Sequence, residues 1–391
     1  MKLQNKSALI GAAFLMATSA IGPGFLTQTT VFTQQLLASC GAVILLSIVL
    51  DIVVQLNIWS ILIVSGKRAS VLVNEVFPGF GHLLTLLVVL GGLAFNIGNI
   101  AGAGLGLNVL FGLSLPMGAV LSAGIAILLF MRKEAGVAMD WFVRVMGIVM
   151  ILLTLYVAVI TDPPLGTVVV RSIVPDRFSW TALITLVGGT VGGYITFAGG
   201  HRLLDAGISG QANLREVSKS AASGILLASL MRILLFLAAL GVIMKGVSLR
   251  PDNPVASVYE YAAGQVGYKM FGIVIWAASI TSVVGSAYTS ISFFKTLDPR
   301  LEGRSNVLTM VFMLISTVIF VVWGKPMVIL IWAGAINGFV LPIALALMLL
   351  AVRQKRIFGA YQHPKWLTVA GWLVVFALLW MSTATLIEQF F

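Results

Sequence analysis

Two short stretches of this 391-residue sequence place glycine next to polar or aromatic side chains inside strongly apolar runs. The first is Gly22-Pro23-Gly24-Phe25, and the second is Gly192-Gly193-Tyr194. Proline lacks the N–H of a helical hydrogen bond and clashes with the preceding turn, while glycine lowers the cost of leaving helical geometry. Each stretch therefore predicts a break in a helix.

A broken helix exposes backbone N–H and C=O groups, which in an apolar environment must face a cavity, an ion or a solute. The half-helix that follows each break presents the positive end of its dipole, which favours anions and carboxylates. Thr27 and Gln28 add neutral donors and acceptors at the first break, and Tyr194 adds them at the second. No acidic residue accompanies either break. Two interrupted helices in corresponding halves of a chain indicate the binding site of a transporter.

The composition shows which environment holds these breaks. Apolar residues make up 59% of the chain, charged residues only 9%, and the mean hydropathy is +1.06, outside the range of soluble globular domains. The formal charge of +11 does not indicate a nucleic-acid partner, because the basic residues fall in short clusters between apolar runs. A single cysteine excludes an intrachain disulfide. The sequence predicts an all-α, polytopic protein of the lipid bilayer.

About 20 apolar residues are needed for each span, and the sequence provides eleven such runs, at 7–37, 42–65, 82–111, 114–131, 139–160, 180–205, 220–244, 265–292, 306–323, 326–351 and 366–389. We expect one domain over 1–391, with one five-helix repeat at about 7–160, a second of opposite topology at about 180–351, and an extra helix at about 366–389. Helices one and six are the interrupted ones.

The basic clusters orient these spans, since loops on the cytoplasmic side carry more Lys and Arg. They are Lys67-Arg68, Arg132-Lys133, Arg215 with Lys219, Lys295 to Arg304, and Arg353 to Lys365. This pattern predicts a cytoplasmic N-terminus and an outward C-terminus. The compact loops favour a bacterial inner membrane. The oligomeric state stays open, and a monomer is compatible with the sequence.

Ionisable residues inside the spans are few, and burial of a charge is costly enough to suggest a function. Asp51 lies in the middle of helix two; it is either a proton or ion-coupling residue or a structural partner of a cation such as Arg232. His201 and Asp205 lie four residues apart on helix six, which favours a local pair at an inner gate over catalysis.

Neutral polar residues offer further candidates. Asn96 and Asn99 share a face of helix three, where they either join helices or line the cavity. On helix eight, Thr281, Ser282 and Ser286 could join carbonyl groups of the first break in a sodium site, because hard cations take oxygen ligands.

Several of these stretches resemble the NRAMP family of proton-coupled divalent-metal transporters, which have the LeuT-like fold. Residues 103–112 resemble the end of the family's third helix, and 188–191 the approach to its sixth-helix metal motif. The metal-binding residues do not carry over. The family's Asp-Pro-Gly-Asn corresponds to residues 22–25 here, its Met-Pro-His to residues 192–194, and its third-helix acids to Asn96 and Asn99; Gln55 falls on the family's second-helix glutamine.

A transition metal needs soft or imidazole ligands together with negative charge, and the altered motifs supply neither. We therefore expect no bound metal and no cofactor, with H⁺ or Na⁺ as the coupling ion. The leading hypothesis is secondary active transport of a small carboxylate-bearing organic solute, such as an amino acid, a cyclic amino acid or a hydroxy acid. The alternative keeps the implied family activity, the transport of Mn²⁺, Fe²⁺ or Mg²⁺. No nucleophile–base pair or paired carboxylates in the core indicate an enzyme.

Overall fold

The structure is a computed structural model that describes residues 3–131, 133–297 and 303–390. Its described residues form helices and connecting turns, without a strand. The elements are α1 (Leu3–Ala20), α2 (Pro23–Leu36), η1 (Leu37–Ser39), α3 (Cys40–Ser65), α4 (Ala69–Val76), α5 (Phe80–Phe111), α6 (Leu115–Met131), α7 (Lys133–Thr161), α8 (Leu165–Ile173), α9 (Trp180–Val191), α10 (Ile195–Asp205), η2 (Gln211–Asn213), α11 (Leu214–Met244), α12 (Pro254–Leu297), α13 (Ser305–Trp323), α14 (Pro326–Ala351), α15 (Lys355–Phe358) and α16 (Lys365–Phe390).

Each of the eleven predicted spans coincides with one of these helices or, at the two breaks, with a pair of helices. Eight described segments are long and apolar enough to cross a membrane, and α7 with α8, bent by 106° at their junction, would be a ninth. This count is smaller than eleven because it joins α2 to α3 and leaves out two shorter apolar helices, Lys6–Ala20 and Leu115–Met131. The predicted polytopic membrane protein is confirmed.

The helix of the eighth predicted span begins earlier in the structure than predicted, and it contains a kink. We expected a loop at 245–264, but α12 already begins at Pro254. Its backbone leaves helical geometry at Ala263 and at Gly264, where φ is +58°. Glycine adopts this left-handed conformation without a steric penalty, so a short first helix can turn into the long apolar one.

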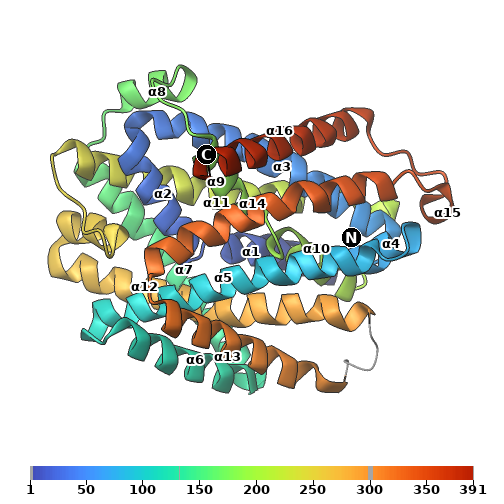
Figure 1. Cartoon of the computed structure of the whole chain (residues 1–391), viewed down its shortest axis with the longest axis horizontal. Coiled ribbons are helices and arrows are strands. Elements are labelled where there is room, and N and C mark those ends of the chain that lie inside the picture. Colours follow the sequence, from blue (N-terminus) through green and yellow to red (C-terminus); the bar gives the residue numbers. More distant parts are fainter. Residues whose placement is uncertain (1–2, 132, 298–302, 391) are drawn as a thin grey trace.

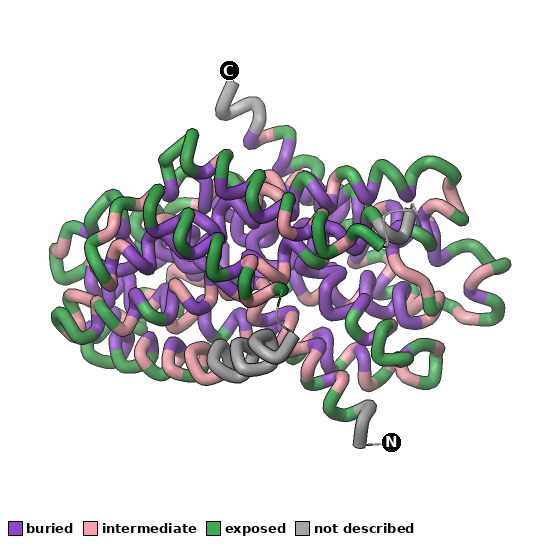
Figure 2. Tube along the Cα trace, turned by 90° about the horizontal axis from the view of Figure 1, so that it is seen from below, coloured by how far each residue is buried: buried purple, intermediate pink, exposed green. Residues whose placement is uncertain are grey.

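Most of the long helices run roughly along the longest dimension of the molecule (Figure 1). One end of the bundle holds α4 and α15, and the opposite end holds α8; we call them the α4 end and the α8 end. The interrupted pair α9 and α10 lies in the centre, since its most apolar stretch is entirely buried. Figure 2 shows the buried residues inside the bundle and the exposed ones around it. The two breaks are therefore enclosed by other helices.

Ion pairs at the α4 end connect segments that are far apart in the chain. Arg68 pairs with Asp205 at 2.7 Å, which joins the α3–α4 corner to the end of α10. Glu75 of α4 pairs with Lys67 and lies 3.6 Å from Arg356. Exposed pairs contribute little stability individually. Their positions show that α4 and α15 close this end of the bundle together.

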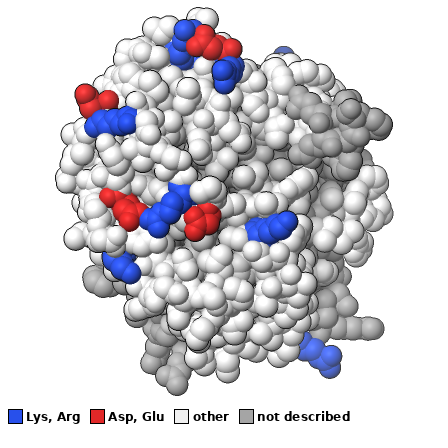
Figure 3. Space-filling view, turned by 60° about the vertical axis from the view of Figure 1, so that its left-hand side comes forward, with Lys and Arg blue, Asp and Glu red and all other residues white. Residues whose placement is uncertain are grey.

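Charges are sparse at the α8 end. Figure 3 shows this end largely free of charge, with several basic groups beside acidic ones. They include the pairs Arg171–Asp176, at 2.5 Å, and Arg250–Glu260. Position 132 and residues 298–302 of the predicted basic clusters lie outside the described residues. A cytoplasmic α4 end stays a prediction from the charge pattern.

A chain of hydrogen bonds fastens the α15–α16 connection to α3. The Asn57 amide nitrogen donates to the Leu367 carbonyl at 3.1 Å, and its oxygen lies 2.9 Å from Nε2 of His363. An amide oxygen only accepts, so His363 donates from Nε2, and Tyr361 then donates to Nδ1 at 2.9 Å. This arrangement requires the neutral imidazole.

We expect this histidine to make the folded state less stable in acid. Burial lowers the pKa of His363 from 6.5 to about 4. The unfolded chain therefore takes up a proton as the pH falls through 6.5, while the folded chain resists until about 4. The contribution of His363 to the free energy of unfolding is fully present above pH 6.5 and is lost as the pH falls from 6.5 to about 4. After solvent screening, this loss amounts to no more than about 1 kcal/mol per pH unit. Thermal unfolding in detergent should show that the melting temperature falls less steeply with decreasing pH in H363Q than in the wild type. An equal loss would contradict the prediction.

Candidate functional site

The first break separates α1 from α2. Gly22 caps α2 with extended backbone angles, φ −108° and ψ −177°, so the chain is not helical there. Pro23 occupies the first position of α2, where the N–H that it lacks has no helical partner in any case. Its ring lies against Gly102 of α5, where a Cβ atom would come within 2.2 Å of the Pro23 Cβ. The predicted break is confirmed, and a glycine on α5 makes room for it.

The second predicted break, between α9 and α10, is also confirmed. Gly193 has φ +54°, in the left-handed region that favours glycine. Asn337 of α14 fills the adjacent space, so that a Cβ on Gly193 would lie 1.8 Å from the Asn337 Oδ1. The Asn337 amide nitrogen donates to the carbonyls of Gly91, at 2.9 Å, and Ala333, at 2.7 Å. Sequence reasoning missed this residue, although a lone Asn in an apolar span is a recognisable signal.

Polar side chains from three helices meet between the two breaks. A Cβ on Gly22 would lie 3.5 Å from the Asn99 Oδ1 and 3.8 Å from the Ser282 Oγ, which are ordinary contacts. The Tyr194 hydroxyl lies beside the side chains of Asn99 and Ser286. All five residues are buried. We call Gly22, Asn99, Tyr194, Ser282 and Ser286 the central site.

One donor of the central site has no partner. Asn99 is only 5% exposed; within the described residues its amide nitrogen, Nδ2, lies beside the Tyr194 hydroxyl but makes no hydrogen bond of good geometry. A buried amide without a partner costs about 1–3 kcal/mol, so this nitrogen is available to a ligand that accepts a hydrogen bond.

The backbone adds positive potential to this site. Leu26 is the first residue of α2 whose N–H reaches a helical carbonyl, that of Gly22 at 3.2 Å. The N–H groups of Gly24 and Phe25 come before it, where the helix dipole is positive. The second half-helix, α10, likewise begins directly after Tyr194. The N-terminus of α2 therefore lies at the central site, and the N-terminus of α10 directly follows Tyr194, whose hydroxyl belongs to that site.

Other predicted site residues act mainly between helices. Asn96 accepts a hydrogen bond from Ser286 at 2.8 Å and donates to Ser316 at 3.0 Å, so it joins α5, α12 and α13. Its amide is fully engaged, which matches the helix-joining alternative. Gln28 donates to the Leu330 carbonyl of α14 at 2.8 Å, and its Oε1 has no partner in the described part of the chain. Thr27 is buried beside it in α2.

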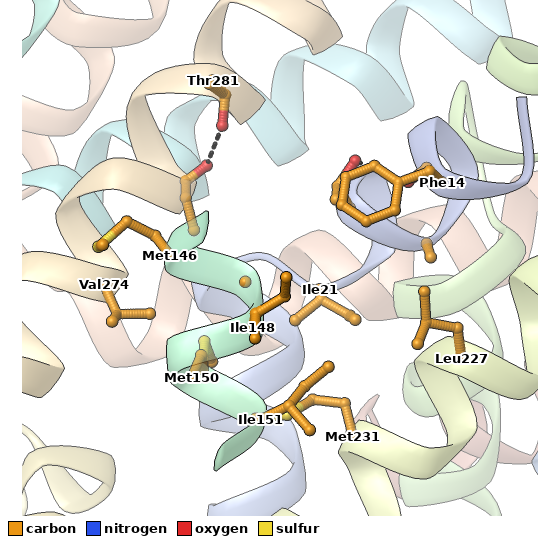
Figure 4. A pocket seen from close by; sticks show the side chains of 14 residues that line it. Phe14, Ile21, Met146, Ile148, Met150, Ile151, Leu227, Met231, Val274 and Thr281 are labelled. Atoms are coloured by element: carbon orange, nitrogen blue, oxygen red, sulfur yellow. Dashed lines mark hydrogen bonds between the residues drawn. The ribbon is translucent and has the colours of Figure 1, made fainter. Parts of the chain in front are cut away.

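Thr281 does not lie with the other two helix-eight candidates in the central site. Its hydroxyl donates to the carbonyls of Ala277, at 3.2 Å, and Ala278, at 3.0 Å. Its side chain lines a cavity of about 140 Å³ between α1, α7, α11 and α12, with Ile21 and Met231 among the surrounding apolar groups (Figure 4). These apolar walls offer almost nothing to hold a carboxylate, so we do not assign the solute to this cavity.

The predicted local pair between His201 and Asp205 is wrong. Asp205 pairs with Arg68, and His201 accepts a hydrogen bond from the N–H of Ala69 at 3.3 Å. Both partners lie at the α3–α4 corner, which the sequence pattern of α10 alone could not reveal. The His201 ring also lies 5.1 Å from the Phe293 ring, so α10 and α12 pack together through aromatic side chains at this point.

Two side chains of α3 hold the first turn of α10, an interaction that the sequence did not predict. The Trp59 indole donates to the Thr196 carbonyl at 2.8 Å, and the Thr196 hydroxyl donates to Gln55 at 2.8 Å. Asp51 lies on the same helix, α3, but faces α9 and α11 behind the breaks.

Among the described residues, no group of three His, Cys, Asp or Glu side chains is placed to hold a metal ion.

Comparison with known proteins agrees with this architecture. YcsG of Bacillus subtilis (strain 168), an uncharacterized membrane protein, is 58% identical over 388 residues, which cover 99% of this chain and 96% of YcsG. A crystal structure of the Eremococcus coleocola manganese transporter, in complex with an aromatic bis-isothiourea substituted compound, has a TM-score of 0.77 at 16% identity and covers 98% of this chain and 86% of its own. MhsT in complex with L-phenylalanine has a TM-score of 0.63 at 14% identity, over 96% of this chain and 97% of its own.

These similarities confirm the expected LeuT-like fold with its two interrupted helices. The model of the natural resistance-associated macrophage protein-like family matches residues 13–388, which is nearly the whole chain. The chain belongs to this family, Nramp, and is a membrane transporter.

Proposed function

We propose that the protein is a secondary active transporter of a small organic solute that carries a carboxylate, such as an amino acid, a cyclic amino acid or a hydroxy acid, coupled to H⁺ or Na⁺. The observation that carries this proposal is the unpaired amide of Asn99 beside the N-terminus of α2. An anion gains from the dipole of this helix and from the free donor, whereas a divalent cation would meet positive potential without a carboxylate ligand.

The solute carboxylate would sit against the start of α2, where it accepts hydrogen bonds from the N–H groups of Gly24 and Phe25 and from Asn99. Tyr194 and Ser282 would select the remainder of the molecule, because their hydroxyls are the other polar groups beside Asn99 and Gly22. A glycine at position 22 leaves room where a larger side chain would intrude. Release toward the α4 end would require the contacts of His201 and Asp205 to open.

Divalent-metal transport is the rival proposal, and it is favoured by the structural likeness to a manganese transporter. In this protein the available ligands would be neutral oxygens of Asn99 and Ser282 and backbone carbonyls at the end of α1. Such a donor set suits a hydrated hard cation better than Mn²⁺, since soft or imidazole groups are missing from the central site.

Thermal unfolding with candidate ligands separates the two proposals. The purified protein would be heated with L-alanine, L-proline or L-lactate, and with Mn²⁺ or Mg²⁺, in sodium and in potassium buffer. A ligand at 100 times its dissociation constant stabilises the folded state by about 2.7 kcal/mol, so its effect is readily visible. Stabilisation by a carboxylate that N99A removes supports the proposal. Stabilisation by a metal alone, reversed by a chelator, would overturn it.

A further inference from the structure

Two buried charged side chains lie behind the breaks and outside the central site. Asp51 of α3 and Arg232 of α11 are each only 1% exposed. The two attract each other electrostatically, but they are not hydrogen-bonded to each other: Nη1 of Arg232 donates to the Leu186 carbonyl at 3.3 Å, and its Nε and Nη2 have no partner. Oδ1 of Asp51 also lacks a partner. We call these two residues the charged pair.

A structural role explains this arrangement poorly. Buried ions cost several kcal/mol each unless hydrogen bonds satisfy them, and here three of their polar atoms make none. Apolar side chains of similar size would pack in this place without that cost. Ionisable residues retained inside a membrane protein usually belong to an ion or proton pathway.

The charged pair touches both interrupted helices. The Arg232 guanidinium lies over the Phe25 ring, 4.2 Å from its centre, in the first turn of α2. Its bond to Leu186 and the position of Asp51 beside Thr190 connect the pair to the last turns of α9. Phe25 also contributes one of the free N–H groups of the central site. A change of charge in the pair is therefore felt directly at the place where a carboxylate would bind.

We propose that Asp51 is the proton-coupling site and that Arg232 transmits its protonation state to the solute site. This inference rests on the proposed function. A hydronium ion gives a proton to the Asp51 carboxylate: one O–H bond of hydronium breaks, an O–H bond forms on Asp51, and a water molecule is left. The pair then changes from neutral to a net charge of +1, and its field draws a carboxylate anion to the start of α2. One proton then crosses with one solute, so the transported charge is zero for a hydroxy acid anion and +1 for a zwitterionic amino acid.

Among the described side chains, Asp51 is the one carboxylate beside Arg232. The helices α2, α9 and α14 contain no acidic residue, and Glu216 of α11 pairs with Lys219 in the first turns of that helix. The charged groups of α10, namely His201, Arg202 and Asp205, lie at the α4 end. Lys365 is at the α4 end as well, and Arg171 of α8 pairs with Asp176 at the opposite end. The Cys40 thiol of α3 is the one further titratable group beside Arg232.

Linkage makes the proposal measurable, because a proton that promotes anion binding must itself be bound more tightly when the anion is present. We expect the carboxylate of the thermal-unfolding panel that stabilises the wild type to bind about tenfold more tightly at low than at neutral pH, a coupling of ordinary size. D51N mimics the protonated state and should bind it tightly at both pH values. R232Q should bind it about tenfold more weakly. R232K, which keeps the charge, should retain the pH dependence.

A second measurement does not depend on the solute. Infrared difference spectra between low and neutral pH should contain, in the carbonyl band of protonated carboxyl groups, a component from Asp51 that the wild type and D252N, an exposed control, share and that D51N lacks. Absence of this component in the wild type would overturn the proton site, whichever ligand binds. Anion binding that is independent of pH would overturn it too. If the Asp51 band is present but no carboxylate binds, the proposed function fails. In that case Asp51 still takes up a proton, but Arg232 does not transmit its protonation state to a carboxylate site.

Discussion

Aspartate in place of Gly22 is expected to abolish binding of the transported carboxylate. The first carbon of the new side chain fits, since a Cβ there makes only ordinary contacts with Asn99 and Ser282. Its carboxylate would occupy the positive end of α2, where the solute carboxylate is proposed to bind. Like charges placed together in a binding site cost several kcal/mol. The affinity should therefore fall by at least about a hundredfold.

The matched control is G22N, which has nearly the same shape and hydrogen-bonding reach as G22D but carries no charge. Uptake into proteoliposomes and thermal unfolding would be measured with the carboxylate that stabilises the wild type. We expect G22N to keep part of the binding and G22D to lose all of it. If the two variants behave alike, size and not charge decides, and the solute carboxylate does not lie at this break. Gain of Mn²⁺ binding by G22D would show that one acid suffices to restore a metal site.

Sequence reasoning predicted both breaks because their causes are local. A proline between two glycines at 22–24 cannot continue a helix, and a left-handed residue at 193 is best provided by glycine. The long spans were equally accessible, since a run of about 20 apolar residues needs no partner to be recognised. The chemistry of the central site followed in part, because Tyr194 stands at the second break itself and Asn99 is a polar residue inside an apolar span.

Side chains whose partners come from distant segments were not predictable in the same way. Asn337 reaches the second break only because α14 packs against α9 and α5. Asp205 pairs with Arg68, 137 positions away, rather than with the residue four positions before it. Periodicity along one helix shows which residues share a face, but it does not show which face meets which neighbour. The outcome for Asp51 is similar: its neighbour Arg232 was named as an alternative, while the missing direct bond emerged only from the fold.

Alanine in place of Gly193 is expected to destabilise the protein strongly, although it adds only a single carbon. The backbone there has φ +54°, which costs about 1–2 kcal/mol for a residue with a side chain. The added Cβ would also lie 1.8 Å from the Asn337 Oδ1, and overpacking of this kind costs typically about 1–3 kcal/mol more. Thermal unfolding in detergent should show a clearly lower midpoint for G193A and, because the second break forms one wall of the central site, weaker carboxylate binding.

The two causes can be separated with Asn337. N337A removes the atom that the new Cβ would strike, so the double variant G193A/N337A should lose less stability than the sum of the single variants, by the steric share of about 1–3 kcal/mol. Gly124 of α6 supplies the control, because a Cβ there meets nothing within 4 Å and its φ is not positive. G124A should unfold at or slightly above the wild-type midpoint, since alanine favours a helix over glycine. Strictly additive losses would show that Asn337 moves aside without cost and that the second break tolerates a side chain.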